Sequence, residues 1–145
     1  MAYRSKEIIT MKNSESPFHR YRHILLNDDY SAAETLQSFT LSCWNGATWK
    51  FRGDRLSNLD NEHLGIFLEL AQQYASHGES DAMFMDTCRE MLKQRRRWAA
   101  ENKAKMDLLA QTSPDDYEEG PAEYWREMDE HAKYYALHQK LYLIE

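Results

Sequence analysis

The spacing of apolar side chains predicts that this chain folds into helices. Between Asp60 and Gly78, apolar residues recur every three or four positions, which places them on one face of a helix. They are Leu64, Phe67, Leu68, Ala71 and Tyr74. Asp60 is suited to cap the start of this helix, and His77–Gly78 is a typical helix end.

Two further helices are predicted in the second half of the chain. Strong helix formers run from Ser80 to Gln111, and Thr112–Ser113–Pro114 ends that long helix. Gly120–Pro121 starts the last helix, because proline suits the first helical position. The expected ranges are 80–111 and 121–143, and the short connection predicts that the two helices pack antiparallel.

Helix-start signals also divide the first part of the chain. Ser16 before Pro17 predicts a cap and a short helix through Leu26. Ser31 and Glu34 have the spacing of a capping box, in which each side chain bonds the other residue's backbone N–H, so a second helix is expected to start there.

Residues 40–51 have two interpretations. Asn45–Gly46 can end a helix, with Gly46 at a positive φ angle. The same pair can also form the type I′ turn of a small hairpin. The capping box upstream favours the helix end.

Composition favours one helical domain. The chain has 145 residues, near the common size of a single domain, and contains no valine, a residue favoured in sheets. We predict an all-α fold of four or five helices, in which the long fourth helix packs antiparallel to the C-terminal helix. Residues 1–14 are expected to form a flexible tail, and residues 15–145 a single helical domain.

No membrane-spanning or secretory pattern is present, so we expect a cytoplasmic protein. No apolar run approaches the ~20 residues that cross a bilayer, and the N-terminus lacks the apolar stretch of a secretory signal. Cys43 and Cys88 lie far apart on predicted apolar helix faces, which favours buried, reduced thiols. A disulfide, or a reactive cysteine beside a histidine, is the alternative.

The net charge of −6 comes from the last quarter of the chain. Residues 112–145 carry three basic and nine acidic side chains, whereas the rest of the chain is balanced. The predicted long helix has seven basic residues from Arg89 to Lys105, against only Glu90 and Glu101. Pairing of this basic segment with the acidic last quarter is the favoured interpretation.

Within the basic segment, three consecutive arginines precede a tryptophan. These residues are Arg95, Arg96, Arg97 and Trp98. Because successive side chains point about 100° apart on a helix, the arginines cannot all lie on one solvated stripe. An Arg–Trp pair suits a cation–π contact or stacking on a base. The segment is a candidate site for a protein partner, with nucleic acid as the alternative, since an acidic protein is an unusual nucleic-acid binder.

A second candidate surface is the loop at residues 44–52. It contains Trp44, Trp49, Phe51 and Arg52. If these side chains are exposed, they form a good binding hot spot. More often, such a loop closes the end of a small helical core.

The last predicted helix carries an aromatic and histidine stripe. Its residues recur at alternating spacings of four and three, so they share one helix face. They are Tyr124, Met128, His131, Tyr135, His138 and Tyr142. The stripe is expected to be either an aromatic packing face or a seam for self-association, which would make the protein a homodimer.

The histidines do not predict a metal site. His131 and His138 lie two helical turns apart, about 10 Å, which is too far for one ion. His19 and His23 lie one turn apart but lack a third ligand within reach. We therefore expect no metal and no cofactor.

The chain also lacks a catalytic signature. Asp60 and His63 have the spacing of a general-base dyad, but the role of helix cap explains Asp60 better. A small enzyme would need His63 or Cys88 exposed in a cleft, and it is the third alternative for function.

One stretch of the chain carries a resemblance. Leu41-Ser42-Cys43-Trp44-Asn45-Gly46 is followed by Leu56, Leu59, Asp60 and an apolar helix. Residues 41–68 thus resemble small helical domains encoded on bacterial plasmids and prophages. The resemblance implies a mobile-element accessory protein and carries no active site.

These features predict a non-catalytic interaction protein, a phage or plasmid accessory factor that acts on a host protein. The alternative is a nucleic-acid-associated regulator that uses the arginine-rich helix. No membrane partner is expected.

Overall fold

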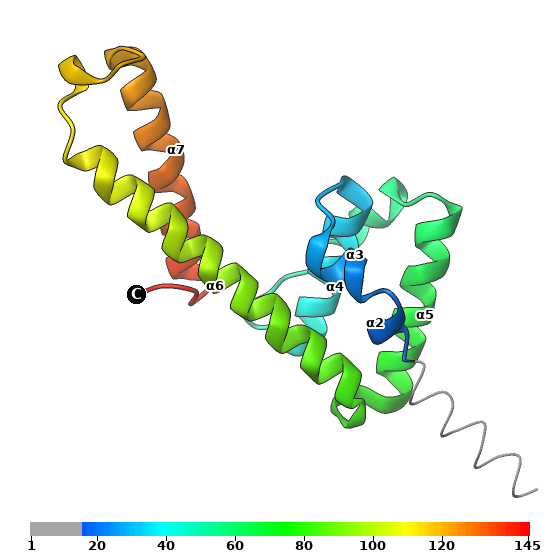
Figure 1. Ribbon diagram of the computed structural model, residues 1–145. Coiled ribbons are helices and arrows are strands. Elements are labelled where there is room, and N and C mark those ends of the chain that lie inside the picture. The colour runs from blue at the N-terminus through cyan, green and yellow to red at the C-terminus, as the bar shows by residue number, and fades with distance from the viewer. Residues whose placement is uncertain (1–15) are drawn as a thin grey trace, which may run out of the picture. The chain divides into compact units, whose positions relative to one another are not determined.

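The computed structural model describes residues 16–145 and confirms the all-α prediction (Figure 1). These residues form α-helices and short 3-10 helices, with no strand among them. The predicted tail, residues 1–14, lies outside the described residues. None of the helices in residues 16–145 has an apolar stretch long enough to cross a bilayer.

The chain divides into two compact units, whereas the sequence led us to expect one domain. The N-terminal unit ends at Met91, and the C-terminal unit runs from Leu92 to Glu145. The boundary falls inside the long helix, where its composition changes. Apolar residues dominate up to Leu92, and the sequence then continues as Lys-Gln-Arg-Arg-Arg. This polar stretch has little apolar surface with which to extend a core.

The N-terminal unit is a bundle of short and medium helices. Its elements are α2 (Pro17–Arg20), α3 (Arg22–Asn27), α4 (Ser31–Trp44), η1 (Gly53–Asn58), α5 (Asn61–His77), η2 (Gly78–Ser80) and the first residues of α6 (Ala82–Ala110). The single short helix predicted through Leu26 is therefore two helices. They are separated at Tyr21, whose backbone (φ −101°, ψ 19°) leaves the helical range.

The predicted caps at Ser16, Asp60 and Gly78 are confirmed. The Ser16 hydroxyl accepts the Phe18 N–H, and the Asp60 carboxylate accepts the His63 N–H at 2.8 Å. Gly78 ends α5 at φ +51°, a conformation that side chains with a Cβ rarely adopt.

The predicted capping box at Ser31 and Glu34 does not form, and that prediction is wrong. Tyr30, with an extended backbone, occupies the cap position of α4, and its carbonyl accepts the Glu34 N–H. Ser31 is already the first helical residue. The Tyr30 hydroxyl is hydrogen-bonded to His63 Nε2 at 2.9 Å, which ties the residue before α4 to α5.

Residues 40–51 form a helix end rather than a hairpin. α4 continues to Trp44, and Asn45 terminates it with an extended backbone. The expected positive φ at Gly46 is absent, because the Asn45 side chain makes the turn instead, accepting the backbone N–H groups of Ala47 and Thr48. A Cβ at Gly46 would lie 3.2 Å from the Ser42 carbonyl oxygen, which is a tight contact.

Aromatic rings and aliphatic side chains fill the core of the N-terminal unit. Phe18 and Phe84 are fully buried and meet edge to face, with ring centroids 4.8 Å apart. The Tyr74 ring lies 5.1 Å from the Phe84 ring. Other fully or almost fully buried side chains come from each of the longer helices: Leu25, Leu36, Leu41, Leu70, Cys88 and Met91.

The C-terminal unit is a helical hairpin. It comprises the rest of α6, the 3-10 helix η3 (Pro114–Asp116) and α7 (Pro121–Lys140). The predicted ranges, 80–111 and 121–143, agree with α6 and α7 to within three residues. The long helix packs antiparallel to the C-terminal one, as expected (Figure 1). Gly120, at φ +96°, precedes Pro121 and makes the sharp entry into α7.

The hairpin buries little apolar surface. Only four of its hydrophobic side chains are buried: Leu92, Ala99, Leu109 and Tyr124. Several large ones are exposed instead: Trp98, Leu108, Trp125, Tyr134, Leu137 and Tyr142. Among the described residues, most of the exposed large hydrophobic side chains therefore lie on the hairpin, as is typical of an interaction surface.

Candidate interaction surface

Four consecutive residues of α6 are here called the α6 patch: Arg95, Arg96, Arg97 and Trp98. Their side chains point about 100° apart in succession around the helix. Arg96 and Arg97 are exposed, and Trp98 is 48% exposed. The Arg95 guanidinium carbon lies 5.7 Å from the centroid of the Trp98 ring, a cation–π contact between neighbouring turns. The contact restrains the Trp98 ring while much of it stays open to solvent.

Ion pairs within single helices occur in the hairpin. On α7, Arg126 binds Glu123, with Nε 2.9 Å from Oε1, and binds Glu130 at 3.2 Å. On α6, Lys103 pairs with Asp107 at 2.7 Å. These pairs engage Lys103 of the basic segment, and Glu123 and Glu130 of the acidic quarter, each within its own helix.

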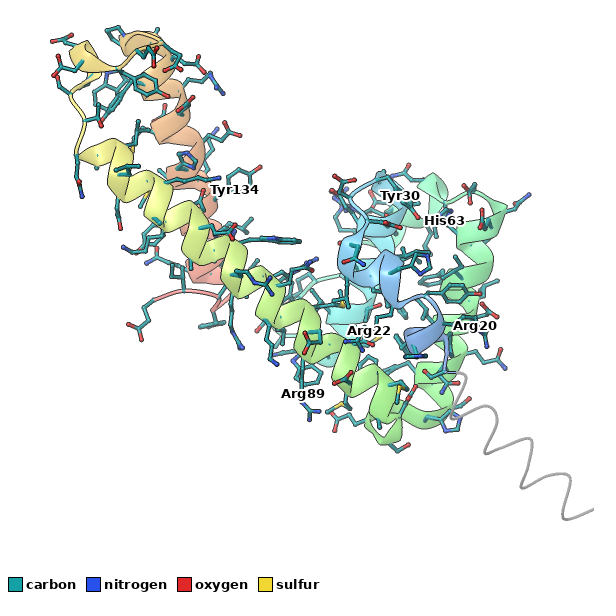
Figure 2. The ribbon with its side chains drawn as sticks, viewed as in Figure 1. Arg20, Arg22, Tyr30, His63, Arg89 and Tyr134 are labelled. Atoms are coloured by element: carbon teal, nitrogen blue, oxygen red, sulfur yellow. The ribbon has the colours of Figure 1, made fainter. Side chains whose placement is uncertain are left out.

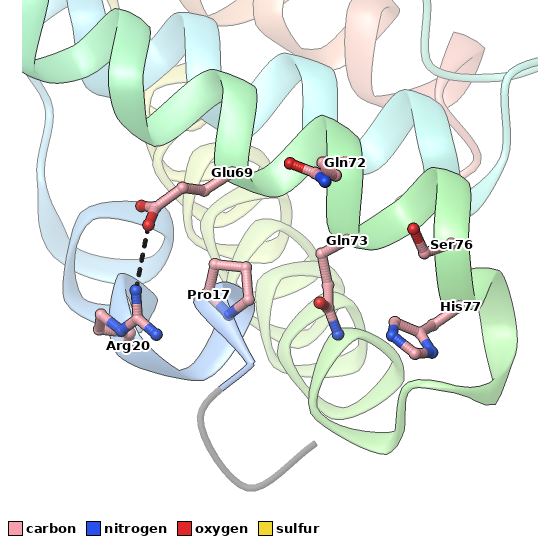
Figure 3. A pocket seen from close by; sticks show the side chains of 7 residues that line it. All are labelled: Pro17, Arg20, Glu69, Gln72, Gln73, Ser76 and His77. Carbon is pink, nitrogen blue, oxygen red and sulfur yellow. Dashed lines mark hydrogen bonds and ion pairs between the residues drawn. The ribbon is translucent and has the colours of Figure 1, made fainter. Parts of the chain in front are cut away.

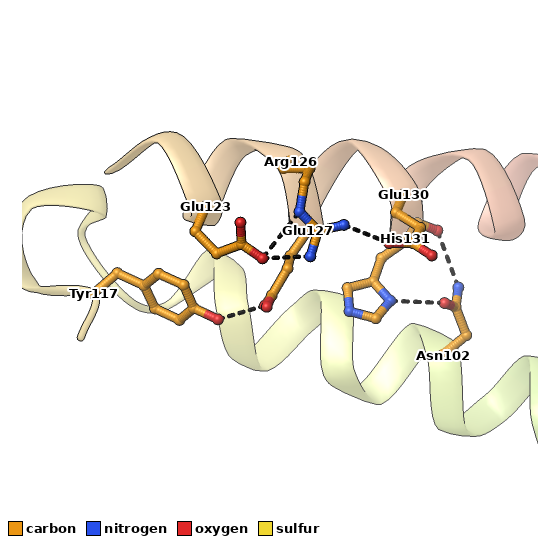
Figure 4. A network of polar contacts seen from close by, with 7 residues as sticks. All are labelled: Asn102, Tyr117, Glu123, Arg126, Glu127, Glu130 and His131. Carbon is orange, nitrogen blue, oxygen red and sulfur yellow. Dashed lines mark hydrogen bonds and ion pairs between the residues drawn. The ribbon is translucent and has the colours of Figure 1, made fainter. Parts of the chain in front are cut away.

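A polar network joins the two helices of the hairpin (Figure 4). The Asn102 side-chain amide donates to the His131 carbonyl at 3.0 Å, and His131 Nδ1–H donates to Asn102 Oδ1 at 2.9 Å. The Tyr117 hydroxyl donates to the Glu127 carboxylate, which raises the pKa of Tyr117 to about 12. These bonds fix the register of α6 against α7 and the orientation of the His131 ring.

The predicted self-association stripe lies mainly inside the hairpin. Tyr124 is buried, and the next members along α7 are half-buried: Met128, His131, Tyr135 and His138. The last member, Tyr142, follows the helix and is 79% exposed. The reciprocal bonds of His131 with Asn102 place this face against α6. The side of α7 that carries Tyr124 and His131 therefore faces α6, as the packing-face interpretation predicts.

The loop at residues 44–52 is partly packed against its own unit. Phe51 joins Phe39 and Phe67, with ring centroids 5.5 Å and 6.1 Å away. Trp44 is half-buried, and the Arg89 guanidinium lies 6.0 Å from its ring centroid.

The two other members of that loop differ from each other. Trp49 is half-buried, whereas Arg52 is exposed and pairs with Asp54 at 2.6 Å. The Arg52 guanidinium lowers the pKa of the Asp54 carboxyl. The loop therefore closes the end of the core and offers less open aromatic surface than the hairpin does.

The Asp60–His63 pair forms part of a short hydrogen-bond chain that also includes Tyr30. Figure 2 labels Tyr30 and His63. His63 Nδ1–H donates to Asp60 Oδ1 at 2.8 Å, and the Tyr30 hydroxyl lies 2.9 Å from His63 Nε2. The backbone N–H of His63, followed by its ring, lowers the pKa of Asp60. Because both ring nitrogens of His63 are engaged, the chain serves to hold α4 and α5 together.

The cysteines are not poised for chemistry. Burial raises the pKa of Cys88 to about 12 and that of Cys43 to about 11. Cys88 has no exposed surface. A thiolate nucleophile needs a lowered pKa and access to a substrate, and Cys88 has neither. No group of three histidine, cysteine or carboxylate side chains in residues 16–145 is arranged to hold a metal ion.

A polar cavity of about 240 Å³ lies beside α2 and α5 (Figure 3). Its lining is mainly polar: Pro17, Arg20, Glu69, Gln72, Gln73, Ser76 and His77. Arg20 and Glu69 pair across it at 3.2 Å, so its two charged side chains satisfy each other.

Sequence reasoning missed the outer side of α7. Trp125 is 56% exposed, and Ala132 and Ala136 are also exposed. The stripe from Tyr124 to Tyr142 was singled out because its spacing is regular, and it became the inner face. The outer face could have been predicted from Trp125, Ala132 and Ala136, because their spacing places them on one side of a helix.

Comparisons with known proteins do not place the chain in a family. No protein-family model, curated protein or solved structure matches it. A functional proposal for this protein therefore rests on its own side chains.

Proposed function

We propose that this protein is a non-catalytic interaction protein that binds an acidic surface of another protein through the α6 patch. The observation that carries the proposal is the exposed Trp98 ring, which Arg95 restrains and which the exposed Arg96 and Arg97 precede in the sequence. Tryptophan and arginine are the residue types most enriched at the energetic centres of protein interfaces.

The chemistry of the patch favours a carboxylate-bearing partner. Arg96 and Arg97 each present a planar guanidinium that can bind a carboxylate with two parallel hydrogen bonds. Trp98 adds a large apolar area whose position is already limited, so that little side-chain entropy is lost on binding. A partner with a shallow apolar pocket rimmed by Asp or Glu matches these groups.

The resemblance of residues 41–68 to plasmid- and prophage-encoded domains supports a role as a mobile-element accessory factor. In that role the partner would be a host protein. A small protein without catalytic groups acts on a host by occupying a surface, and the α6 patch is suited to that task.

Single-stranded nucleic acid is the second candidate ligand of the α6 patch. Exposed arginines beside an exposed tryptophan suit phosphate contact and base stacking. The net charge of −6 opposes this candidate, since nucleic-acid binders usually present an unopposed basic field.

A capture experiment with matched variants tests the proposal. The test variant is Arg96→Ala/Arg97→Ala/Trp98→Ala. The control variant is Lys50→Ala/Arg52→Ala/Leu68→Ala, which removes two cations and one exposed apolar side chain from the N-terminal unit. We expect a host protein to be retained by the wild type and the control, and lost by the test variant. Equal retention by all three proteins would exclude the α6 patch as the binding site.

Nucleic acid is tested separately with a labelled single strand and a labelled duplex. If the second candidate is right, affinity falls steeply with salt and disappears in the same test variant. If neither probe binds at low salt, the nucleic-acid candidate is excluded.

A further inference from the structure

The outer side of α7 carries an exposed stripe distinct from both the α6 patch and the inner aromatic face. Its members are Trp125, Asp129, Ala132, Lys133 and Ala136, all exposed. Their positions cover about 100° of the helix, and the inner residues Tyr124 and His131 lie well outside that arc. This outer stripe is apolar at its ends and charged between them.

Charge is strongly polarised along the hairpin. The contact between Asn102 and His131 joins α6 and α7 at one height along the hairpin, and this height divides the hairpin into two parts. On the open side of this level, the base (residues 92–102 and 131–145) has six Lys and Arg against two Asp and Glu, or +4. On the side of the turn, the tip (residues 103–130) has three against nine, or −6. Two such hairpins attract each other when they lie antiparallel, base against tip.

The outer stripe repeats this complementarity at the level of single residues. Asp129 and Lys133 stand two residues on either side of His131, about 3 Å along the axis. A two-fold axis through that level places Asp129 opposite Lys133 of a second copy, and Lys133 opposite its Asp129. One axis thus makes two ion pairs.

Apolar residues follow the same symmetry. Trp125 stands six residues, about 9 Å, on the tip side of His131, and Ala136 stands five residues on the base side. The two-fold axis brings the Trp125 ring over Ala136 of the second copy. Ala132, one residue from the axis, leaves room for the two helices to approach closely. The Trp125 ring packs edge-on against Tyr124, with centroids 5.0 Å apart, so it is already oriented.

We propose that a second copy of this chain binds the outer stripe of α7, so that two α7 helices lie antiparallel across a two-fold axis level with His131. A foreign acidic partner would use only the base of the hairpin and leave the tip unmatched. A second copy matches both ends at once. Such an isologous interface uses the same patch on both subunits.

Charge exchange at Asp129 and Lys133 tests this geometry directly. Asp129→Lys places a lysine against Lys133 of the second copy, twice, and Lys133→Asp places an aspartate against Asp129 of the second copy, twice. We expect each single variant to raise the dissociation constant of the dimer at least about tenfold. Both positions are exposed, so the fold should persist, and circular dichroism checks it.

Two experiments that should restore self-association distinguish the antiparallel dimer from any other association. The double variant Asp129→Lys/Lys133→Asp should recover wild-type self-association. An equimolar mixture of the two single variants should also recover it, as a heterodimer, because every cross pair is then attractive. Sedimentation equilibrium of the full chain, in low and high salt, measures both. A dimer that fails to recover in the mixture, or a wild type that stays monomeric at hundreds of micromolar, overturns the proposal.

The aromatic contribution has its own matched pair of variants. Trp125→Ala should weaken self-association about tenfold, and Tyr142→Ala, an exposed aromatic outside the outer stripe, should leave it unchanged. Equal effects of the two variants would also overturn the proposal. None of these substitutions touches the α6 patch, so a monomeric wild type that still captures a host protein would leave the proposed function intact.

Discussion

The two units of this protein differ in how their helices are stabilised. Among the described residues, the N-terminal unit buries eleven hydrophobic side chains and the C-terminal unit buries four. The first unit joins several helices around fully buried rings, whereas the second consists of two helices joined by a polar network and a narrow apolar seam. Hydrophobic burial therefore contributes more to the stability of the first unit than to that of the second.

The difference lies in the composition of α6. Its first turns carry Phe84, Cys88 and Met91, all fully buried. Its later turns carry the α6 patch, and their buried hydrophobic side chains are Leu92, Ala99 and Leu109. One helix therefore serves as a core element in its first third and exposes many of its side chains farther along.

The largest expected effect is in the first unit. Phe84→Ala removes a fully buried ring that packs on Phe18 and Tyr74, so it should lower the free energy of unfolding by about 3–5 kcal/mol. Leu108→Ala, at a side chain that is 67% exposed in the hairpin, should change it by less than about 0.5 kcal/mol. Urea denaturation followed by circular dichroism measures both, and equal losses would contradict the contrast between the units.

A smaller effect is expected at the start of α6. The buried Asp81 carboxylate accepts hydrogen bonds from the Ser16 hydroxyl at 2.6 Å, the Gln73 amide at 3.1 Å and the Met83 N–H at 3.0 Å. Asp81→Ala leaves these donors unpaired and should cost about 2 kcal/mol in the same assay. The exposed Asp115 is the control, and its replacement by Ala should be nearly neutral.

In the second unit, Asn102→Ala should cost about 1 kcal/mol, because it removes both bonds to His131. The effect should be confined to the hairpin, where backbone hydrogen exchange of α7 rises. Nitrogen-15 NMR of His131 should show the proton on Nδ1 in the wild type. A proton on Nε2 alone would contradict the assigned network.

The smallest effect is on pH dependence. Burial raises the pKa of Cys88 from 9.0 to about 12, so the folded state favours the neutral thiol. This stabilisation is fully present below the unfolded pKa and is lost as pH rises toward 12. At pH 9 the loss should be under about 0.5 kcal/mol, and it should be absent in Cys88→Ala. Iodoacetamide should label Cys88 only after unfolding, and rapid labelling of the native protein at neutral pH would contradict this.

Local signals in the sequence predicted most of the fold. Ser16, Asp60 and Pro121 act within one helical turn, so their roles follow from sequence alone. The prediction that Ser31 caps α4 was wrong because His63, a distant residue, binds Tyr30, and Tyr30 occupies the cap position instead. The prediction of a positive φ angle at Gly46 was wrong because the Asn45 side chain makes the turn by accepting the N–H groups of Ala47 and Thr48.

The candidate surface was predicted less completely. The arginines and Trp98 stood out by residue type, and the structure leaves Arg96, Arg97 and Trp98 exposed. The sequence could not show which face of α7 packs against α6, because the residues of both faces have helical spacing. Only the contact between His131 and Asn102 identifies the inner face. The spacing of apolar residues identifies a helix face but does not show which other part of the protein packs against it.

The N-terminal unit buries its own core, and we propose that a second copy covers the outer stripe of α7. Hydrogen exchange of the full chain, at low and at high protein concentration, distinguishes these two sources of stability. We predict that peptides containing Leu36, Leu41 and Phe84 exchange equally slowly at both concentrations, and that peptides of α7 become more protected at the higher one. If the protection of α7 does not depend on protein concentration, a second copy does not stabilise this helix.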